Sequence, residues 1–360
     1  MQVSVVDLFC GVGGLTKGLE LADLNVVAGI DINESCRFAY ETNNHSRFIL
    51  GDITNIDIKD IERLYPEDGI KILVGCAPCQ PFSKYTQRYR KEGHKDDKWR
   101  LLYSFSDIIR EIHPQIVSME NVPELTNEQV FQDFIDVLEK EDYHCSWQIV
   151  YCPDYGVPQK RKRLVLLASR LGDIQLIDPI YNENNYLTVR NAIGNLPELA
   201  NGEVNQHDPM HRVVKMSDKN LERIRQSTPG GTWREWDENL KLNCHKKDTG
   251  KSYGAVYGRM QWDEPSPTIT TQFYGYGNGR FGHPDQDRAI SYREGAILQS
   301  FPPDYQFIPE DKTEFSLKAL GIHIGNAVPV ELGRTIGMSI WEHINQMYSG
   351  KAGINDFNNN

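Results

Sequence analysis

A cysteine and a glutamate in this chain each follow a short apolar run of the kind that forms a buried strand. Cys79 lies in a Pro-Cys-Gln-Pro turn after the run 70–74, and Glu120 ends the run that begins at 116. The carboxyl ends of parallel strands meet at one edge of a sheet, where open α/β folds bind ligands. A thiol and a carboxyl in one crevice would pair a nucleophile with a hydrogen-bonding group. For Glu120, a helix cap or an ion pair with an arginine remains an open alternative.

A glycine-rich turn ends the first apolar run, and a carboxylate follows the next run. Gly11 and Gly13 precede a helical pattern, and Asp31 stands 20 residues past Gly11. Glycines let the backbone approach a ligand, and a strand-end Asp can accept hydrogen bonds from ribose hydroxyls. A dinucleotide fingerprint needs a third glycine where this chain has Thr16. The turn therefore favours a ligand with a ribose but no pyrophosphate, such as S-adenosylmethionine, over a nicotinamide cofactor.

Strand-like and helical patterns alternate through the first half of the chain. The apolar, β-branched runs are 3–8, 26–30, 70–74, 116–119, 147–151 and 164–168. Helical spacing of apolar residues lies between them, as in 101–112 and 130–138. This alternation predicts an α/β fold with a doubly wound, mostly parallel, Rossmann-like sheet.

The rhythm changes after about residue 172, where turns rich in Asn, Gly and aromatic residues begin. Helical character returns near Arg293 and again from Pro329. We therefore expect a first domain at 1–172, a smaller irregular domain at 173–285, a return segment at 286–348 that packs on the first domain, and a frayed tail at 349–360.

Composition and charge fit a soluble cytoplasmic protein with reduced thiols. The hydrophobic fraction is 39%, no run approaches the roughly 18 apolar residues of a membrane helix, and the seven cysteines are an odd, scattered set. The net charge of −11 argues against a polyanionic partner, but two basic segments, 84–100 and 160–163, reverse it locally. Because each lies beside a predicted strand end, we expect them to bind phosphates rather than only solvent.

Six segments in order resemble the motif set of the DNA (cytosine-5)-methyltransferases of the bacterial restriction-modification type. They are 7–14, 78–80, 120–122, 159–163, 293–302 and 325–329, and the resemblance covers residues 3 to about 345. Six motifs in family order are far more specific than any single one.

The resemblance implies the chemistry and the residues that perform it. A methyl group would pass from S-adenosylmethionine to C5 of a cytosine flipped out of double-stranded DNA. Cys79 would bond to C6, Glu120 would contact N3, and Arg163 would stabilise charge at O2 with support from Arg161. No motif names the base that removes the C5 proton.

The resemblance also implies the binding residues. The cofactor pocket would comprise Phe9, Gly11, Gly13, Asp31, Ile32, Asp52, Ile53, Leu101, Asn326 and Val328. The family carries Asp-x-Arg before this Leu, whereas this chain has Lys98 at the Arg position, so either Lys98 or Arg100 takes that role. DNA contacts would come from Gln80 beside the nucleophile, and from Ser83, Lys84, Arg88 and Arg90 in a closing loop at 83–99. Further contacts would come from Thr268, Gln272 and Arg280 in a recognition domain. Tyr274 and Tyr276 share the glycine-rich loop of Arg280.

Other readings compete less well with this one. A zinc cytidine deaminase would need a second Cys where Phe82 stands, and a single C-x-x-C predicts no metal site. A tRNA cytosine-5 methyltransferase of the same fold and a catalytically silent DNA-binding relative remain as alternatives. The expected partners are double-stranded DNA and a cognate restriction endonuclease that acts on the same site without a stable complex. We expect a monomer with no membrane association.

Overall fold

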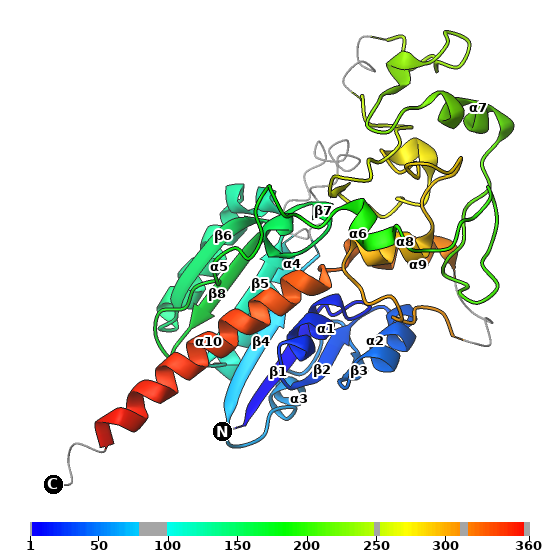
Figure 1. Ribbon diagram of the computed structural model, residues 1–360. Coiled ribbons are helices and arrows are strands. Elements are labelled where there is room, and N and C mark those ends of the chain that lie inside the picture. The colour runs from blue at the N-terminus through cyan, green and yellow to red at the C-terminus, as the bar shows by residue number, and fades with distance from the viewer. Residues whose placement is uncertain (1, 79–98, 248–252, 310–315, 356–360) are drawn as a thin grey trace. The chain divides into compact units, whose positions relative to one another are not determined.

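Two compact units make up the chain, as described by a computed structural model of residues 2–78, 99–247, 253–309 and 316–355 (Figure 1). Unit 1 comprises Met1–Tyr151, Lys162–Pro179 and Val328–Asn360, and unit 2 comprises Cys152–Arg161 and Ile180–Ala327. This division differs from the predicted bounds: residues 152–161 and 286–327 group with unit 2, and residues 173–179 group with unit 1.

Unit 1 is built on a seven-stranded sheet. Its strands are β1 (Val3–Leu8), β2 (Val26–Asp31), β3 (Arg47–Leu50), β4 (Ile70–Gly75), β5 (Ile116–Asn121), β6 (His144–Tyr151) and β8 (Lys162–Ser169). The spatial order is β3-β2-β1-β4-β5-β8-β6. Strand β8 runs antiparallel to both of its neighbours, β5 and β6, and the other neighbouring pairs are parallel. The expected doubly wound, mostly parallel α/β sheet is therefore confirmed, and all six predicted strands are present.

Helices cover the sheet of unit 1, as Figure 1 shows. They are α1 (Gly14–Leu21), α2 (Arg37–Asn43), α3 (Ile58–Glu62), α4 (Arg100–Ile112), α5 (Gln129–Lys140) and α10 (Val330–Asn355). The apolar face of α4, with Phe105 and Ile109, packs with Phe134 of α5 onto alternate strand residues such as Val6 and Leu8. Because strand side chains alternate between faces, buried Val5 belongs to the opposite side of the sheet.

Helices α1 and α10 touch through their backbones. A Cβ on Gly18 would come within 2.3 Å of the Val330 carbonyl oxygen and 2.5 Å of the Arg334 nitrogen, so only glycine fits there. Helix α10 thus holds the helix that follows the glycine-rich turn. It continues to Asn355, into the segment expected to fray, while residues 356–360 lie outside the described residues.

Unit 2 contains short elements joined by long irregular segments. They are β7 (Gln159–Lys160), β9 (Ser266–Pro267), α6 (Val189–Ile193), α7 (Asp218–Gln226), α8 (Tyr292–Leu298) and α9 (Leu317–Asn326). Strands β7 and β9 pair in parallel, and the buried Gln159 amide donates to the Leu298 carbonyl oxygen at the end of α8. Gln299 in turn donates to the Ile324 carbonyl oxygen of α9. These buried amides tie α8, α9 and β7 into one polar core.

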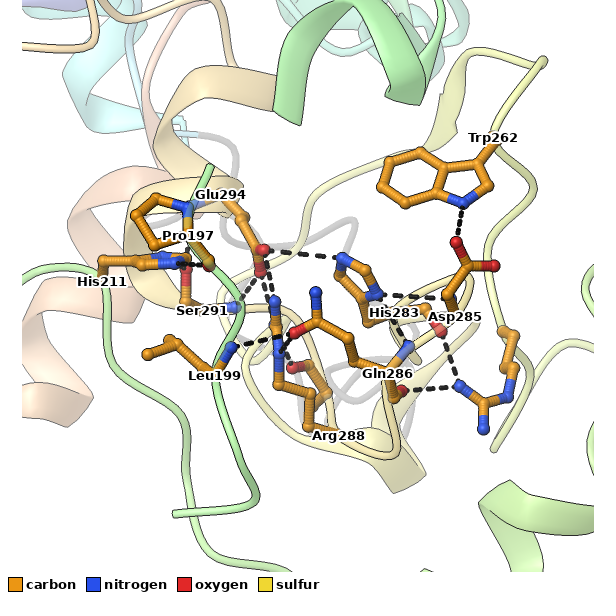
Figure 2. Close-up of polar contacts among 12 residues, drawn as sticks. Pro197, Leu199, His211, Trp262, His283, Asp285, Gln286, Arg288, Ser291 and Glu294 are labelled. Atoms are coloured by element: carbon orange, nitrogen blue, oxygen red, sulfur yellow. Dashed lines mark hydrogen bonds and ion pairs between the residues drawn. The ribbon is translucent and has the colours of Figure 1, made fainter. Parts of the chain in front are cut away.

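A buried ion pair anchors the start of α8 (Figure 2). Arg288 donates to both carboxylate oxygens of Glu294, at 2.8 and 2.7 Å, and the Ser291 N–H donates at 2.6 Å. Burial by itself would raise the pKa of Glu294, but the hydrogen bonds and charge of Arg288 outweigh it and hold the pKa at about 2. Two buried charges are tolerated here because each has its partner.

Among the helices of the described residues, none combines the length and apolar character needed to cross a membrane.

Candidate active site

Three neighbouring strands of unit 1 each bring one polar side chain to the same place. Cys76 directly follows β4, Glu120 lies in β5, and Arg163 lies in β8. The Cys76 thiol donates to Oε2 of Glu120 at 2.8 Å, and Nε of Arg163 lies 2.8 Å from Oε1. The Glu120 side chain is 2% exposed, so this is a desolvated carboxyl held between a thiol and a guanidinium.

The segment that leads to the predicted nucleophile, residues 77–78, is hydrogen-bonded to the residue next to Glu120. Asn121, the neighbour of Glu120, donates from Nδ2 to the Ala77 carbonyl oxygen at 3.1 Å. Ala77 and Pro78 lead directly to Cys79, which lies outside the described residues. The predicted DNA contacts Gln80, Ser83, Lys84, Arg88 and Arg90 lie outside them as well, as does Lys98.

The turn after β1 is conformationally unusual. Phe9, Gly11 and Gly13 all have positive φ, at 61°, 51° and 87°, and for Phe9 this left-handed region is disfavoured by its Cβ. The Gly11 N–H donates to Oδ2 of Asp31 at 2.9 Å, so the turn and the end of β2 are held together. Strained backbone held by its surroundings is typical of ligand-binding turns.

A cavity of about 420 Å³ opens beside this turn, large enough for a small ligand. It is lined by Phe9, Asp31, Ile32, Gly51, Asp52, Ile53, Pro78, Arg100 and Leu101. Ile32 is 68% exposed and contributes an apolar side chain to the cavity wall. The structure thus brings together six of the predicted cofactor residues. Gly11 does not line the cavity itself but is hydrogen-bonded to Asp31, which does.

Two other predicted cofactor residues lie where the chain passes from unit 2 to unit 1. Asn326 is exposed at the end of α9 in unit 2, and Val328 is buried where the chain re-enters unit 1. Neither is among the described residues that line the cavity. Their assignment to the cofactor pocket stays a prediction.

Arg100 is a cavity residue that the sequence left undecided against Lys98. Its Nη2 donates to Oγ1 of Thr54 at 3.0 Å, and Thr54 donates from N and Oγ1 to Oδ1 of Asp52. These Thr54 hydrogen bonds lower the pKa of Asp52, and the charge of Arg100 adds to the effect. Asp52 is therefore an oriented, ionised carboxylate at the cavity wall.

Below the glycine-rich turn lies a buried carboxyl that the sequence did not single out. Oδ2 of Asp7 accepts from Oγ1 of Thr16 at 2.7 Å, and that hydroxyl also lies 3.1 Å from the Tyr40 hydroxyl. Burial raises the pKa of Asp7 to about 7, with the nearby charge of Asp31 contributing and Thr16 opposing. Through its hydrogen bond with Thr16, this carboxyl joins β1 to α1, the two elements that flank the turn.

Arg161, predicted to assist Arg163, makes hydrogen bonds within unit 2. Its side chain is buried in unit 2, where Nη1 donates to the Ile269 carbonyl oxygen at 3.1 Å and Nη2 to that of Gly325 at 3.4 Å. These contacts join the segment after β9 to the end of α9. The structure therefore supplies a scaffolding use for this guanidinium.

The predicted DNA-reading residues of unit 2 differ in exposure. Thr268 and Gln272 are exposed, and Thr268 donates to the Lys160 carbonyl oxygen. Arg280 is half-buried and donates from Nη1 to the Gly231 carbonyl oxygen at 2.6 Å, and burial lowers its pKa. Tyr276 is 3% exposed with its hydroxyl 2.9 Å from Ser227 Oγ, so it is a core residue rather than a reader of base edges.

Comparison with known proteins agrees with this geometry. Residues 3–342 match the model of the family described as C-5 cytosine-specific DNA methylase. The chain is 54% identical over 343 residues to the type II methylase M.HgiDII of Herpetosiphon aurantiacus, covering 94% of this chain and 95% of that one. It is 30% identical to the type II methyltransferase M.Sau96I of Staphylococcus aureus, covering 95% of this chain and 76% of that protein.

Solved structures share the fold. A candidate DNA modification methyltransferase encoded within a prophage of E. coli superposes with a TM-score of 0.71 at 19% identity. The superposition covers 96% of this chain and all of the other.

Proposed function

Because the chain belongs to the C-5 cytosine-specific DNA methylase family, we propose that it methylates C5 of one cytosine in a specific double-stranded DNA sequence. The family confirms the expected enzyme class, a DNA (cytosine-5)-methyltransferase. The similarity to M.HgiDII supports a modification enzyme of a type II restriction-modification system, with a cognate endonuclease acting on the same site. Since the proposed substrate is cellular DNA, we place the enzyme in the cytoplasm.

The observation that carries the proposal is the buried Glu120 carboxyl beside Arg163. Cytosine C5 is a weak nucleophile, so the ring must first be activated by addition at C6. In the proposed reaction the Cys79 thiolate bonds to C6. The electrons of the C5–C6 double bond are then displaced towards N3 and O2 of the cytosine ring. A proton carried on the Glu120 carboxyl would pass to N3, and Arg163 at O2 would stabilise the negative charge that develops there.

The remaining steps restore the aromatic ring. C5 would take the methyl group that bound S-adenosylmethionine would supply, with the neutral thioether as the leaving group. The C5 proton leaves, the C6–sulfur bond breaks, and the thiolate of Cys79 returns. The basic segment around Arg163 favours ionisation of a thiol that otherwise has a pKa of about 8.5.

The cavity beside Phe9 fits S-adenosylmethionine, which supplies the methyl group when bound. Apolar side chains on its wall suit an adenine ring, and the carboxylates Asp31 and Asp52 suit ribose hydroxyls and an exocyclic amine. The positive-φ glycines allow close backbone approach beside the start of α1. The chain thus offers a site for a ribose without phosphates.

The target cytosine must leave the base stack before it can react, because its C5 and C6 atoms are shielded in a stacked duplex. We propose that the base is flipped out at a cost of a few kcal/mol, offset by contacts to the pocket and the backbone. Lys84, Arg88 and Arg90 would bind phosphates, with Gln80 and Ser83 beside the target. Thr268, Gln272 and Arg280 would read base edges.

A DNA substrate with 5-fluorocytosine at the target position tests the covalent step. Fluorine at C5 cannot leave as a proton does, so the enzyme should remain bonded to C6 and migrate as a protein–DNA adduct under denaturing conditions. Cys79→Ala should form no adduct and still bind S-adenosylmethionine. Cys145→Ala, which removes a half-buried thiol in β6, should behave as the parent does.

Bisulfite sequencing of DNA from expressing cells tests the reaction and finds the site. We expect 5-methylcytosine in one short sequence context. Methylation of tRNA instead of DNA, or adduct formation by Cys79→Ala, would contradict the proposal.

A further inference from the structure

The two carboxylate oxygens of Glu120 have different neighbours. Oε2 accepts a hydrogen bond from the Cys76 thiol at 2.8 Å. Oε1 lies 2.8 Å from Nε of Arg163, but this contact is an ion pair without hydrogen-bond geometry, and Oε1 accepts no hydrogen bond from the described residues. One oxygen is therefore committed to the protein, while the other retains hydrogen-bonding capacity.

We propose that Cys76 is a positioning residue for the Glu120 carboxyl. Its thiol fixes Oε2 and thereby orients the carboxyl, so that Oε1, when it carries the proton, faces N3 of the cytosine. This inference rests on the proposed function, in which Glu120 contacts the flipped base.

The sheet register explains why these residues meet. Gly75 at the end of β4 pairs with Met119 of β5, so Cys76 and Glu120 are the next residues along two adjacent parallel strands. On the other side of β5, Glu120 pairs with Val165 of β8. Arg163 is two residues from Val165 and so on the same face. Glu120 of β5 thus has Cys76, after β4, on one side and Arg163 of β8 on the other.

Burial explains why such a contact matters. A carboxyl that is 2% exposed has lost its hydration and depends on protein donors to hold its orientation. A neutral thiol is a weak donor, but a charged acceptor strengthens the hydrogen bond. A neutral thiol also adds no second positive charge beside Glu120. The positive charge next to this carboxyl is therefore that of Arg163, which is proposed to contact O2 of the cytosine.

The kinetic test compares Cys76→Ala, Cys76→Ser and Cys145→Ala. Cys145 is the matched control, because it is also a half-buried thiol that donates to a protein oxygen, the Tyr143 carbonyl at 3.8 Å. We expect Cys76→Ala to lower kcat about tenfold, equivalent to about 1.4 kcal/mol, with KM for DNA and for S-adenosylmethionine within twofold of the parent. Cys76→Ser, whose hydroxyl can donate to Oε2, should recover most of the loss.

Two kinetic results would overturn the inference. One is a kcat of Cys76→Ala equal to that of Cys145→Ala, and the other is a Cys76→Ser variant no better than Cys76→Ala. Both are read against a parent enzyme that methylates cytosine, so an inactive parent would instead refute the proposed function.

Infrared spectroscopy tests the hydrogen bond without catalysis. The S–H stretching band of Cys76 is identified by its loss in Cys76→Ser. In Glu120→Gln a neutral amide replaces the carboxylate, so the band should move to higher frequency, as a weaker hydrogen bond requires. An unchanged band would show that the thiol does not donate to this group, even if Cys76→Ala failed to fold.

Discussion

The side-chain amide of Asn121 donates a hydrogen bond to the carbonyl oxygen of Ala77, two residues before Cys79. The bond is buried and joins the end of β5 to the segment that carries the predicted nucleophile. Asn121→Ala should therefore displace Cys79 from the crevice and lower kcat by at least about tenfold. The buried Ala77 carbonyl would lose its donor, at a cost of about 1–3 kcal/mol in the free energy of unfolding.

Steady-state kinetics and denaturant unfolding of Asn121→Ala measure both effects. Thr126→Ala is the control, because Thr126 also donates to a backbone carbonyl, that of Pro123, but within its own turn. Asn121→Ala with the kcat of the Thr126→Ala control would mean that the nucleophile is positioned by other contacts.

Arg100 is expected to contribute to cofactor affinity through Asp52. Removing its guanidinium in Arg100→Ala frees Thr54 from its hydrogen bond and opens one wall of the cavity. We expect the Kd for S-adenosylmethionine, measured by calorimetry, to rise about fivefold, which is under 1.4 kcal/mol. Arg110→Ala is matched to it, because Arg110 lies on the same helix in an exposed ion pair with Asp107. Equal Kd values for the two variants would remove Arg100 from the site.

Local patterns predicted six of the seven sheet strands, including the edge strand β6, but not the other edge strand, β3. The runs at Val3 and Ile116 are continuous and apolar because both faces of those strands are buried. Arg47–Leu50 has only four residues and one fully buried side chain, so its pairing with β2 comes from tertiary context rather than from its own pattern.

The site shows the same limit. Glu120 was identified because it ends a strand, whereas its contact with Cys76 depends on which strands become neighbours and in which register. The place of Arg100 at the cavity also needed three dimensions, since Lys98 and Arg100 both precede Leu101 within three residues. Lys98 lies outside the described residues, so the choice between the two stays a prediction. The turn at Asp52 was within reach of the sequence, because an Asp followed two residues later by Thr is a common Asx-turn pattern.

The buried Asp7 carboxyl predicts a pH dependence of stability. Its pKa is raised from 3.8 to about 7 in the folded chain, so the folded state holds a proton that the unfolded state releases between these values. The unfolded state binds fewer protons in this window, and stability therefore falls as the pH rises from about 4 to about 7. The shift corresponds to about 4 kcal/mol.

Asp7→Asn cannot ionise and should flatten this dependence, as measured by denaturant unfolding between pH 5 and pH 8. Asp60→Asn, which removes an exposed carboxylate paired with Arg63, should leave the slope of the parent unchanged. A slope in Asp7→Asn as steep as that of the parent would assign the dependence to other groups.

Arg280 is expected to read a guanine rather than only attract DNA. Its Nη1 is held by the Gly231 carbonyl oxygen, which fixes the plane of the guanidinium in a half-buried position. A fixed guanidinium can make the bidentate contact to guanine O6 and N7 that a lysine ammonium reproduces poorly. Arg280→Lys keeps the positive charge, so the salt dependence of DNA binding should stay the same. Discrimination at one base pair should fall by about 1–3 kcal/mol.

Competition binding against every single-base variant of the methylated sequence, at several salt concentrations, separates these two effects. Arg225→Lys serves for comparison, since Arg225 is exposed and paired with Asp287. If Arg280→Lys weakens binding equally for all sequences, the residue contacts phosphate and reads no base. If its discrimination matches that of Arg225→Lys, Arg280 lies outside the interface. A guanine contact requires relaxed preference at a single position with an unchanged salt slope. The positive charge attracts every sequence alike, whereas the bidentate guanidinium contact distinguishes one base edge from another.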